Sequence, residues 1–261
     1  MDKAFIEGFE YYLTIDRRLK RSSISSALST LQTIVRMAVK KGVLDFYPFL
    51  GYSYERPKGE PRSITQDELQ KIIDLEIERE NYRIVRDLFV FSCFTGLAIS
   101  DMENLKYKHI QTAADGQRYV RKERQKTKVE FVVPLHPIAE AIISHCRNEQ
   151  ERNEEKQTVK EKGDSLVFQP HCSRSVMGKN LSIVGKACGI RLKLSYHVAR
   201  HTFGTMSLSA GIPIESIAKM MGHASIASTQ IYAQVTDNKI SEDMDRLIRR
   251  QQKEETKGEA I

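Results

Sequence analysis

Apolar side chains recur at intervals of three and four through residues 22–41, as they do on the buried face of a helix. Ser22 or Ser23 is placed to cap the first turn of this segment, and Gly42 stands just past its end. Residues 3–13 repeat the pattern over a shorter length. The pattern therefore predicts two helices in this part of the chain.

Helical and strand-like periods alternate in the rest of the chain. Residues 51–61 have no periodicity and carry two prolines, which is typical of a linker. Residues 84–94 are apolar enough to form a buried helix. Two pairs have the spacing that caps the start of a helix, namely Thr65 with Glu68 and Ser100 with Glu103.

From about residue 107 to residue 134 the period changes to alternation, which predicts two or three short antiparallel strands. A charged stretch at 147–164 has the pattern of an exposed loop, and helical spacing resumes from Ser173. Pro213 suits a first helical turn, and Gly211 and Gly222 suit helix ends. The expected fold is mainly α with a small antiparallel β-sheet.

Composition places the chain among ordinary globular proteins, with 40% apolar and 29% charged residues. Its 41 basic and 34 acidic residues leave a net charge of +7, which favours a polyanionic partner such as nucleic acid. No apolar run approaches the roughly 20 residues that span a bilayer, and no signal peptide is recognised. The four cysteines form no CxxC pair, which argues against a zinc site or a disulfide framework. A reducing, cytoplasmic environment fits this cysteine usage.

The segment His197-Val198-Ala199-Arg200-His201 is the most informative in the chain. On a helix, its two histidines and its arginine share one face, where they would repel one another unless an anion lay among them. A zinc-protease HExxH site is excluded because Val198 stands where that motif needs glutamate. The alternative that stays open is an ordinary basic cluster on a helix surface.

A glycine-histidine pair, Gly222-His223, follows that segment, and Tyr232 comes nine residues after the histidine. The combination of HxxRH, GH and a following tyrosine resembles the C-terminal signature of the tyrosine recombinase (phage-type integrase) family. Upstream, residues 94–101 (FTGLAISD) resemble the family's TGLRxS box, and residues 124–127 (RQKT) resemble its β-hairpin element. A lone tyrosine is usually a packing residue, so Tyr232 gains its meaning only from this combination.

The resemblance implies a role for each matching residue. Tyr232 would attack the scissile phosphate and form a 3′-phosphotyrosyl link, with Arg200 holding two phosphate oxygens through its planar fork. His197 would act as general base or as a hydrogen-bond partner near the phosphate. His223 would donate a further hydrogen bond, and Lys126 would protonate the leaving 5′-oxygen.

Two further residues have supporting roles in this interpretation. Asp101 would orient its neighbours, and His201 is taken as structural. Further cations between residues 118 and 128 would lie along the DNA backbone and bind it without regard to sequence: Arg118, Arg121, Lys122, Arg124 and Lys128.

The resemblance also implies the organisation of the chain and its partners. It divides the chain into a partial core-binding helical domain at 1–54, a linker at 55–63, a catalytic domain at 64–236 and a C-terminal tail or exchange helix at 237–261. The linker would let the two domains close around a duplex as a clamp. Double-stranded DNA is the expected substrate, bound by a homotetramer on two DNA sites, with room for accessory DNA-bending proteins. No cofactor and no metal is implied, because the covalent link conserves the phosphodiester bond energy.

Ala98 departs from the family pattern, which has its first catalytic arginine at this position. Three explanations stay open: another cation has taken over, the residue was engineered, or the enzyme is degenerate. Compensation is favoured here, because the other five catalytic positions are intact. The arginines considered for it are Arg83, Arg86, Arg121 and Arg124. The alternative function is a catalytically impaired DNA-binding protein of the same fold; a relaxing topoisomerase of the same chemistry is less favoured.

Overall fold

The computed structural model describes residues 2–54, 63–154, 163–169 and 172–232, together with residues 244, 245 and 248. The chain divides into two compact units, residues 1–60 and residues 61–261. The predicted linker lies almost wholly outside the described residues, as does most of the predicted C-terminal segment. No helix in the described ranges is both long enough and apolar enough to cross a bilayer.

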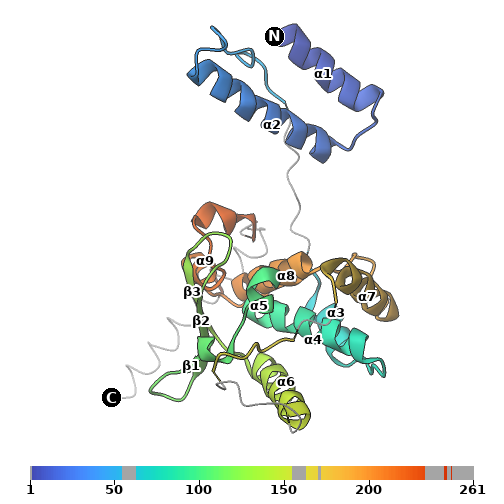
Figure 1. Ribbon diagram of the computed structural model, residues 1–261, viewed down its shortest axis with the longest axis vertical. Helices are drawn as coiled ribbons and strands as arrows, with labels where there is room; N and C mark the ends of the chain where they lie inside the picture. Colours follow the sequence, from blue (N-terminus) through green and yellow to red (C-terminus); the bar gives the residue numbers. More distant parts are fainter. Residues whose placement is uncertain are drawn as a thin grey trace. The chain divides into compact units, whose positions relative to one another are not determined.

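The first unit contains the two expected helices, α1 (Lys3–Ile15) and α2 (Arg21–Lys40), lying side by side in Figure 1. Their facing apolar side chains form a small core of their own, in which Ile6 and Leu28 are fully buried. The predicted serine cap of α2 is wrong. The helix begins at Arg21, and Lys20 is the cap residue because its carbonyl oxygen accepts the first backbone hydrogen bonds of the helix. No side chain caps this end.

The second unit is built around α4 (Glu80–Thr95), the buried helix that the sequence predicts. It packs against α3 (Gln66–Ile73), α6 (Pro137–Glu154), α7 (Arg174–Ala187) and α8 (Tyr196–Ser209), as Figure 1 shows. Phe89 and Phe91 of α4 are fully buried at the centre of this core. The predicted capping box of Thr65 and Glu68 is present at the start of α3.

A three-stranded antiparallel sheet follows η1 (Tyr107–His109), which confirms the predicted change of period. Its strands are β1 (Ile110–Thr112), β2 (Arg118–Glu123) and β3 (Glu130–Pro134), in that spatial order. Val120 of β2 pairs with Val133 of β3, and both side chains are buried. Successive side chains of a strand point to opposite faces, so the neighbouring cations Arg121 and Lys122 of β2 face away from each other.

Two expected boundaries are corrected by the structure. The short helix α5 (Ile99–Glu103) begins at Ile99 with Ala98 in the cap position, so Ser100 lies inside the helix and does not cap it. The predicted loop from residue 147 is wrong at its start, because α6 continues to Glu154. The side-chain amide of Gln150 donates to the carbonyl oxygens of Leu166 and Val167, which ties this turn of α6 to the next segment.

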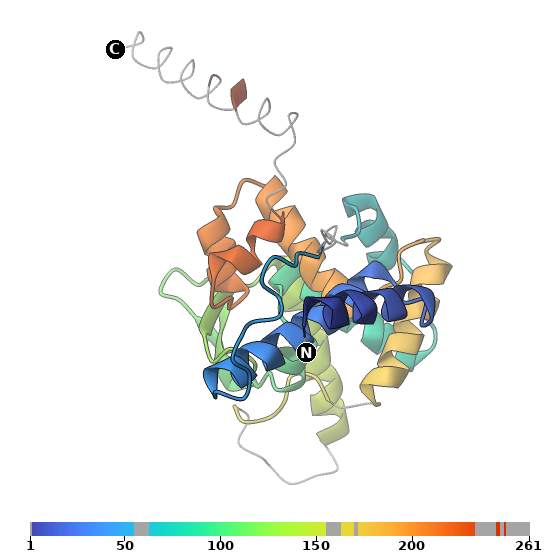
Figure 2. The same ribbon diagram turned by 90° about the horizontal axis from the view of Figure 1, so that it is seen from above.

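The chain then returns across α8 through three short elements. These are α9 (Ile214–Met220), η2 (Ile226–Ser228) and η3 (Gln230–Tyr232). Gly211 and Gly222 adopt positive φ at the two helix ends predicted from the sequence, and Pro213 is the residue before α9. In both ribbon views α9 lies beside β3, which places the C-terminal end of α9 next to the hairpin joining β2 and β3 (Figures 1 and 2).

Candidate active site

Helix α8 carries the first group of predicted site residues. Its start is capped by the hydroxyl of Ser195, which accepts from the amide of Val198 at 3.2 Å. Arg200 points inward and is buried, with 6% of its surface exposed. Its guanidinium donates to the carbonyl oxygen of Gly96 at the end of α4 and to that of Met221 at the end of α9. The ends of α4 and α9 therefore hold this arginine of α8 in one orientation.

A second guanidinium lies beside the first. Arg124, just past the end of β2, donates from Nη1 to the carbonyl oxygen of Gly222 at 3.2 Å. Consecutive carbonyl groups, those of Met221 and Gly222, thus hold two arginines from different parts of the chain. Burial and then the charge of Arg124 lower the pKa of Arg200, to about 10. Two guanidinium groups held on neighbouring carbonyl groups form a site that favours an anion.

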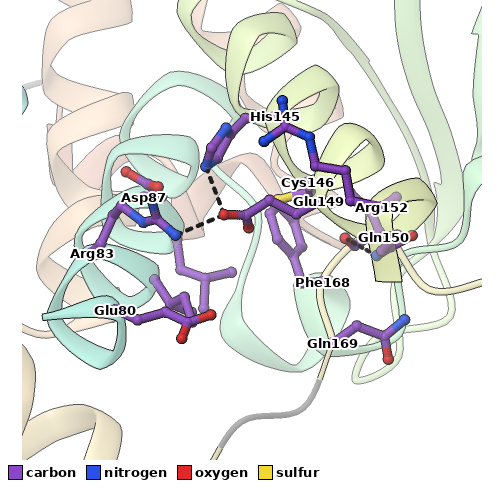
Figure 3. Close-up of a pocket in the computed structure, with 13 residues that line it drawn as sticks. Glu80, Arg83, Asp87, His145, Cys146, Glu149, Gln150, Arg152, Phe168 and Gln169 are labelled. Carbon is purple, nitrogen blue, oxygen red and sulfur yellow. Dashed lines mark hydrogen bonds and ion pairs between the residues drawn. The ribbon is translucent and has the colours of Figure 1, made fainter. Parts of the chain in front are cut away.

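The other three arginines considered as replacements for the residue at 98 lie elsewhere. Arg83 pairs with Glu149 at 2.6 Å in a pocket of about 400 Å³ between α4 and α6, shown in Figure 3. Arg86 is bound to Asp87 and to backbone carbonyl groups, and Arg121 pairs with Glu130 on the other face of the sheet. Of the four, Arg124 alone reaches the residues around Arg200.

The three predicted histidines gather at the same place. Nε2 of His197 lies 2.9 Å from Nε2 of His201, one turn further along α8. Nδ1 of His223 lies 2.7 Å from the hydroxyl of Thr229. Burial lowers the pKa values of His201 and His223 to about 4, helped by nearby positive charge, and it lowers the pKa of His197 as well. All three rings are therefore neutral at pH 7.

Tyr232 lies beside Arg200 and His201 of the same chain. It packs in a small apolar cluster with Phe203, Ile217 and Met221, and 8% of its surface is exposed. Its ring meets that of His201 edge to face at 5.4 Å between centroids. Burial raises the pKa of the Tyr232 hydroxyl, while Arg200 and then Arg124 oppose that rise. The phenol is protonated at neutral pH until a substrate changes this balance.

The hairpin turn after β2 is fastened to the site. Asp101, which is 1% exposed, accepts at 2.9 Å from the amide of Gln125, and the hydroxyl of Thr127 donates to the carbonyl of Gly222 at 3.1 Å. Lys126 projects from this turn and is exposed, close enough to His197 to help lower its pKa. The fold thus brings the predicted residues of the site together: Asp101, Lys126, His197, Arg200, His201, His223 and Tyr232.

The remaining predicted DNA-binding cations are spread around the hairpin. Arg118 and Lys122 are half-buried in β2, while Arg121 is exposed on the opposite face and lies over the ring of Tyr119. Lys128 is exposed in the turn with a positive φ of 58°. The strand therefore does not present these side chains as one continuous basic stripe.

Sequence reasoning missed two residues of the site. Thr229 is fully buried against His223, and nothing in its short segment distinguishes it from a surface threonine. Gly204 packs against Tyr232, where an added Cβ would lie 2.7 Å from the ring. Its position one helical turn after Arg200 was the feature of the sequence that could have indicated this role. Among the described residues, no group of three or more histidine, cysteine or acidic side chains is arranged to hold a metal ion.

Comparisons with known proteins match both units. Residues 62–239 match the phage integrase family, and residues 1–55 match the phage integrase SAM-like domain. The tyrosine recombinase XerC of Pediococcus pentosaceus is 26% identical over 252 residues, covering 93% of this chain and 80% of the relative. The XerC protein of Bacillus pumilus is also 26% identical, over 256 residues, covering 90% of this chain and 81% of the relative.

Solved structures show the same fold at lower identity. The XerH site-specific recombinase bound to its difH substrate superposes with a TM-score of 0.67 at 19% identity, covering 94% of this chain and 70% of that one. The Tn1549 transposon integrase in complex with circular intermediate DNA gives 0.64 at 16% identity, covering 94% and 85%. A lambda integrase dimer bound to a core site gives 0.64 at 18% identity, covering 89% and 79%.

Proposed function

The chain belongs to the phage integrase family, and from that premise we propose that it cleaves and rejoins double-stranded DNA at specific sites through a covalent bond to Tyr232. Membership of this family supports the general activity, which is site-specific DNA recombination by a tyrosine recombinase. The finer proposal rests on one observation: two arginines, held by the carbonyls of Met221 and Gly222, lie beside a buried tyrosine in the same chain.

In the proposed cleavage step, the hydroxyl oxygen of Tyr232 attacks the scissile phosphorus and gives up its proton, either to His197 or to a non-bridging oxygen of the phosphate. The bond from phosphorus to the 5′-oxygen breaks, which leaves a 3′-phosphotyrosyl link and a 5′-oxygen that takes a proton from Lys126. Rejoining is the reverse, with a 5′-hydroxyl as the nucleophile and Tyr232 as the leaving group. One phosphoester bond is exchanged for another, so the step needs no external energy source.

Arg124 and Arg200 would bind the phosphate together. A guanidinium stabilises developing charge on phosphate oxygens in a directional way, and one such arginine is worth roughly 10³–10⁵ in rate in phosphoryl transfer. Arg124 is therefore proposed as the cation that replaces the arginine missing at Ala98. Its position supports an active enzyme over the alternative, a DNA-binding protein that has lost cleavage.

The histidines complete the proposed site. His223 donates a hydrogen bond to the phosphate from Nε2, since its Nδ1 is occupied by Thr229. His197 has two roles open to it, as the base that takes the proton of Tyr232 or as a hydrogen-bond partner of the phosphate. Asp101 holds the hairpin that carries Lys126, through the amide of Gln125.

Covalent trapping tests the proposal. The protein is incubated with randomised duplexes that carry a nick near the cleavage position, so that the short 5′-ended strand diffuses away and the adduct persists. We expect adducts on a subset of sequences, joined to Tyr232. Tyr232→Phe should abolish them while DNA affinity stays within a few-fold, because only the attacking oxygen is lost. Adducts formed by the Phe variant would exclude Tyr232 as the nucleophile.

We further propose that four protomers act together on two duplexes. The motivation is an apolar stripe in the predicted tail, formed by Ile240, Met244, Leu247 and Ile248, only two of which are among the described residues. Such a stripe needs a covering surface, and a neighbouring protomer can supply it. Deletion of residues 237–261 should abolish synapsis but leave binding of one protomer to one site. Tetramers that persist on DNA after the deletion would contradict this.

A further inference from the structure

His201 lies between His197 and Tyr232, which both take part in the proposed cleavage step. On one side its Nε2 is 2.9 Å from Nε2 of His197, with the two rings at 78° and their centroids 4.3 Å apart. On the other side its ring packs edge to face against the ring of Tyr232, with 5.4 Å between the ring centroids. His201 is 9% exposed. Within the described part of the protein, its side chain makes one hydrogen bond, the contact with His197.

The contact between two nitrogen atoms requires one proton. Both rings are neutral at pH 7, since burial and the neighbouring positive charges lower both pKa values. A neutral imidazole carries a proton on one nitrogen and a lone pair on the other. Either His201 donates to His197, or His197 donates to His201, and each choice fixes which nitrogen is protonated in both rings.

The environment of the second nitrogen of His201 decides between the two. Its Nδ1 is buried and has no hydrogen-bond partner among the residues that the structure describes. If His197 were the donor, this buried atom would carry a proton with no acceptor, and orphaned buried N–H groups are rarer in proteins than under-used acceptors. The lower-energy arrangement leaves a lone pair there, so His201 carries its proton on Nε2 and donates it to His197.

We propose that His201 is a positioning residue that fixes His197 with its proton on Nδ1, ready to donate to a phosphate oxygen of DNA. His197 is exposed, so its second nitrogen is accessible to a ligand. The proposal rests on the proposed function and selects the second of the two roles open to His197. With Nε2 accepting from His201 and Nδ1 already protonated, His197 does not take the proton of Tyr232, which passes instead to a non-bridging oxygen of the phosphate.

A matched pair of variants separates the hydrogen bond from the packing of the ring. His201→Gln keeps an N–H donor at about the distance of Nε2, whereas His201→Met has nearly the same length and volume but no donor. Both fill the space against Tyr232. The two variants should therefore differ only in the property that the proposal invokes, and their melting temperatures show whether both fold.

The first measurement is made on the free protein, by nitrogen NMR with ¹⁵N-labelled histidine. Among the seven histidines, His197 is identified by the signal lost in His197→Gln. We expect its Nε2 to show the shift of a hydrogen-bonded acceptor and its Nδ1 that of a protonated nitrogen. This pattern should persist in His201→Gln and become a mixture of tautomers in His201→Met. A wild-type His197 protonated on Nε2 overturns the proposal.

The second measurement is the rate of covalent trapping on a nicked duplex. His201→Met should form the adduct about twofold to tenfold more slowly, which is the worth of one hydrogen bond between neutral groups, with DNA affinity unchanged. His201→Gln should recover most of the rate. Equal rates for both variants contradict the proposal. If the wild type forms no adduct with any DNA, the proposed function fails, and the NMR result on free protein still decides the tautomer.

Discussion

The hydroxyl of Thr229 lies 2.7 Å from Nδ1 of His223. Thr229 is fully buried, and its carbonyl oxygen accepts the amide of Tyr232 at 3.0 Å. One residue therefore connects the histidine after α9 to the short helix η3, which carries the proposed nucleophile. The contact also occupies Nδ1 of His223, which leaves Nε2 as the nitrogen for the proposed hydrogen bond to the phosphate.

Thr229→Val tests this connection, because valine has the shape of threonine but lacks the hydroxyl. We expect cleavage to fall about tenfold, since His223 loses the bond that fixes its ring and its tautomer. Binding of DNA should be unchanged. Thr229→Ser, which keeps the hydroxyl, serves as the control and should retain most of the activity. Wild-type cleavage rates in the valine variant would show that the contact has no part in the reaction.

Arg124→Ala should slow cleavage by roughly 10³–10⁵, the usual worth of an arginine in phosphoryl transfer. Arg124→Lys should recover only part of this loss, because an ammonium group lacks the planar fork. The double variant with Ala98→Arg should regain some activity. Adduct formation on a nicked duplex is the measurement.

Arg83→Ala and Arg121→Ala are the matched controls for Arg124, since both side chains are paired with glutamates away from the site. Neither should change the cleavage rate by more than a few-fold. A different result would reverse the assignment: no effect of Arg124→Ala, with a gain of orders of magnitude from Ala98→Arg alone. That outcome identifies the chain as an impaired or engineered enzyme.

Much of the candidate site could be predicted from the sequence because its signals are local. The spacing of His197, Arg200 and His201 places them on one face of any helix, and the capping box of α3 needs only residues three apart. The choice of Arg124 among four arginines could not be predicted, because its contact with Gly222 joins residues 98 apart in sequence. Contacts between segments far apart in the sequence determine which arginine reaches the site, and local propensity does not encode such contacts.

Stability should fall as the pH decreases from about 6.5 toward 4. In the unfolded chain histidine titrates near 6.5, whereas His201 and His223 have folded pKa values of about 4. Between these values the unfolded state binds more protons, so acidification favours unfolding. The charged or titratable groups beside the two rings are Arg124, Arg200, His197 and Tyr232.

The melting temperature of His201→Gln isolates this effect from other titrating groups. The half-buried carboxyl of Asp87 has a pKa raised by burial and acts in the opposite direction, while Asp164, with a pKa of about 2, titrates below the window. Both are unchanged in the variant. The melting temperature of wild type should therefore drop more steeply than that of His201→Gln between pH 6.5 and pH 4. Parallel curves would contradict the low folded pKa of His201.

Lys122 and Arg121 are neighbours in β2, yet they should contribute differently to DNA binding. Strand geometry places Lys122 on the face of Arg124, two residues along, and places Arg121 on the opposite face, where it pairs with Glu130 at 3.4 Å. The phosphate that Arg124 binds lies, by the proposed function, on the face of Lys122. We therefore expect Lys122 to contact the DNA backbone and Arg121 to remain outside the contact.

The measurement is the dependence of DNA affinity on salt concentration for Lys122→Ala and Arg121→Ala. Each phosphate contact contributes about 0.9 to the slope of log affinity against log salt, through release of condensed counterions. Lys122→Ala should reduce the slope by about that amount and weaken binding to all sequences alike, while Arg121→Ala should leave the slope unchanged. If both variants reduce the slope equally, DNA contacts both faces of the strand, and the sheet lies across the backbone in a different orientation.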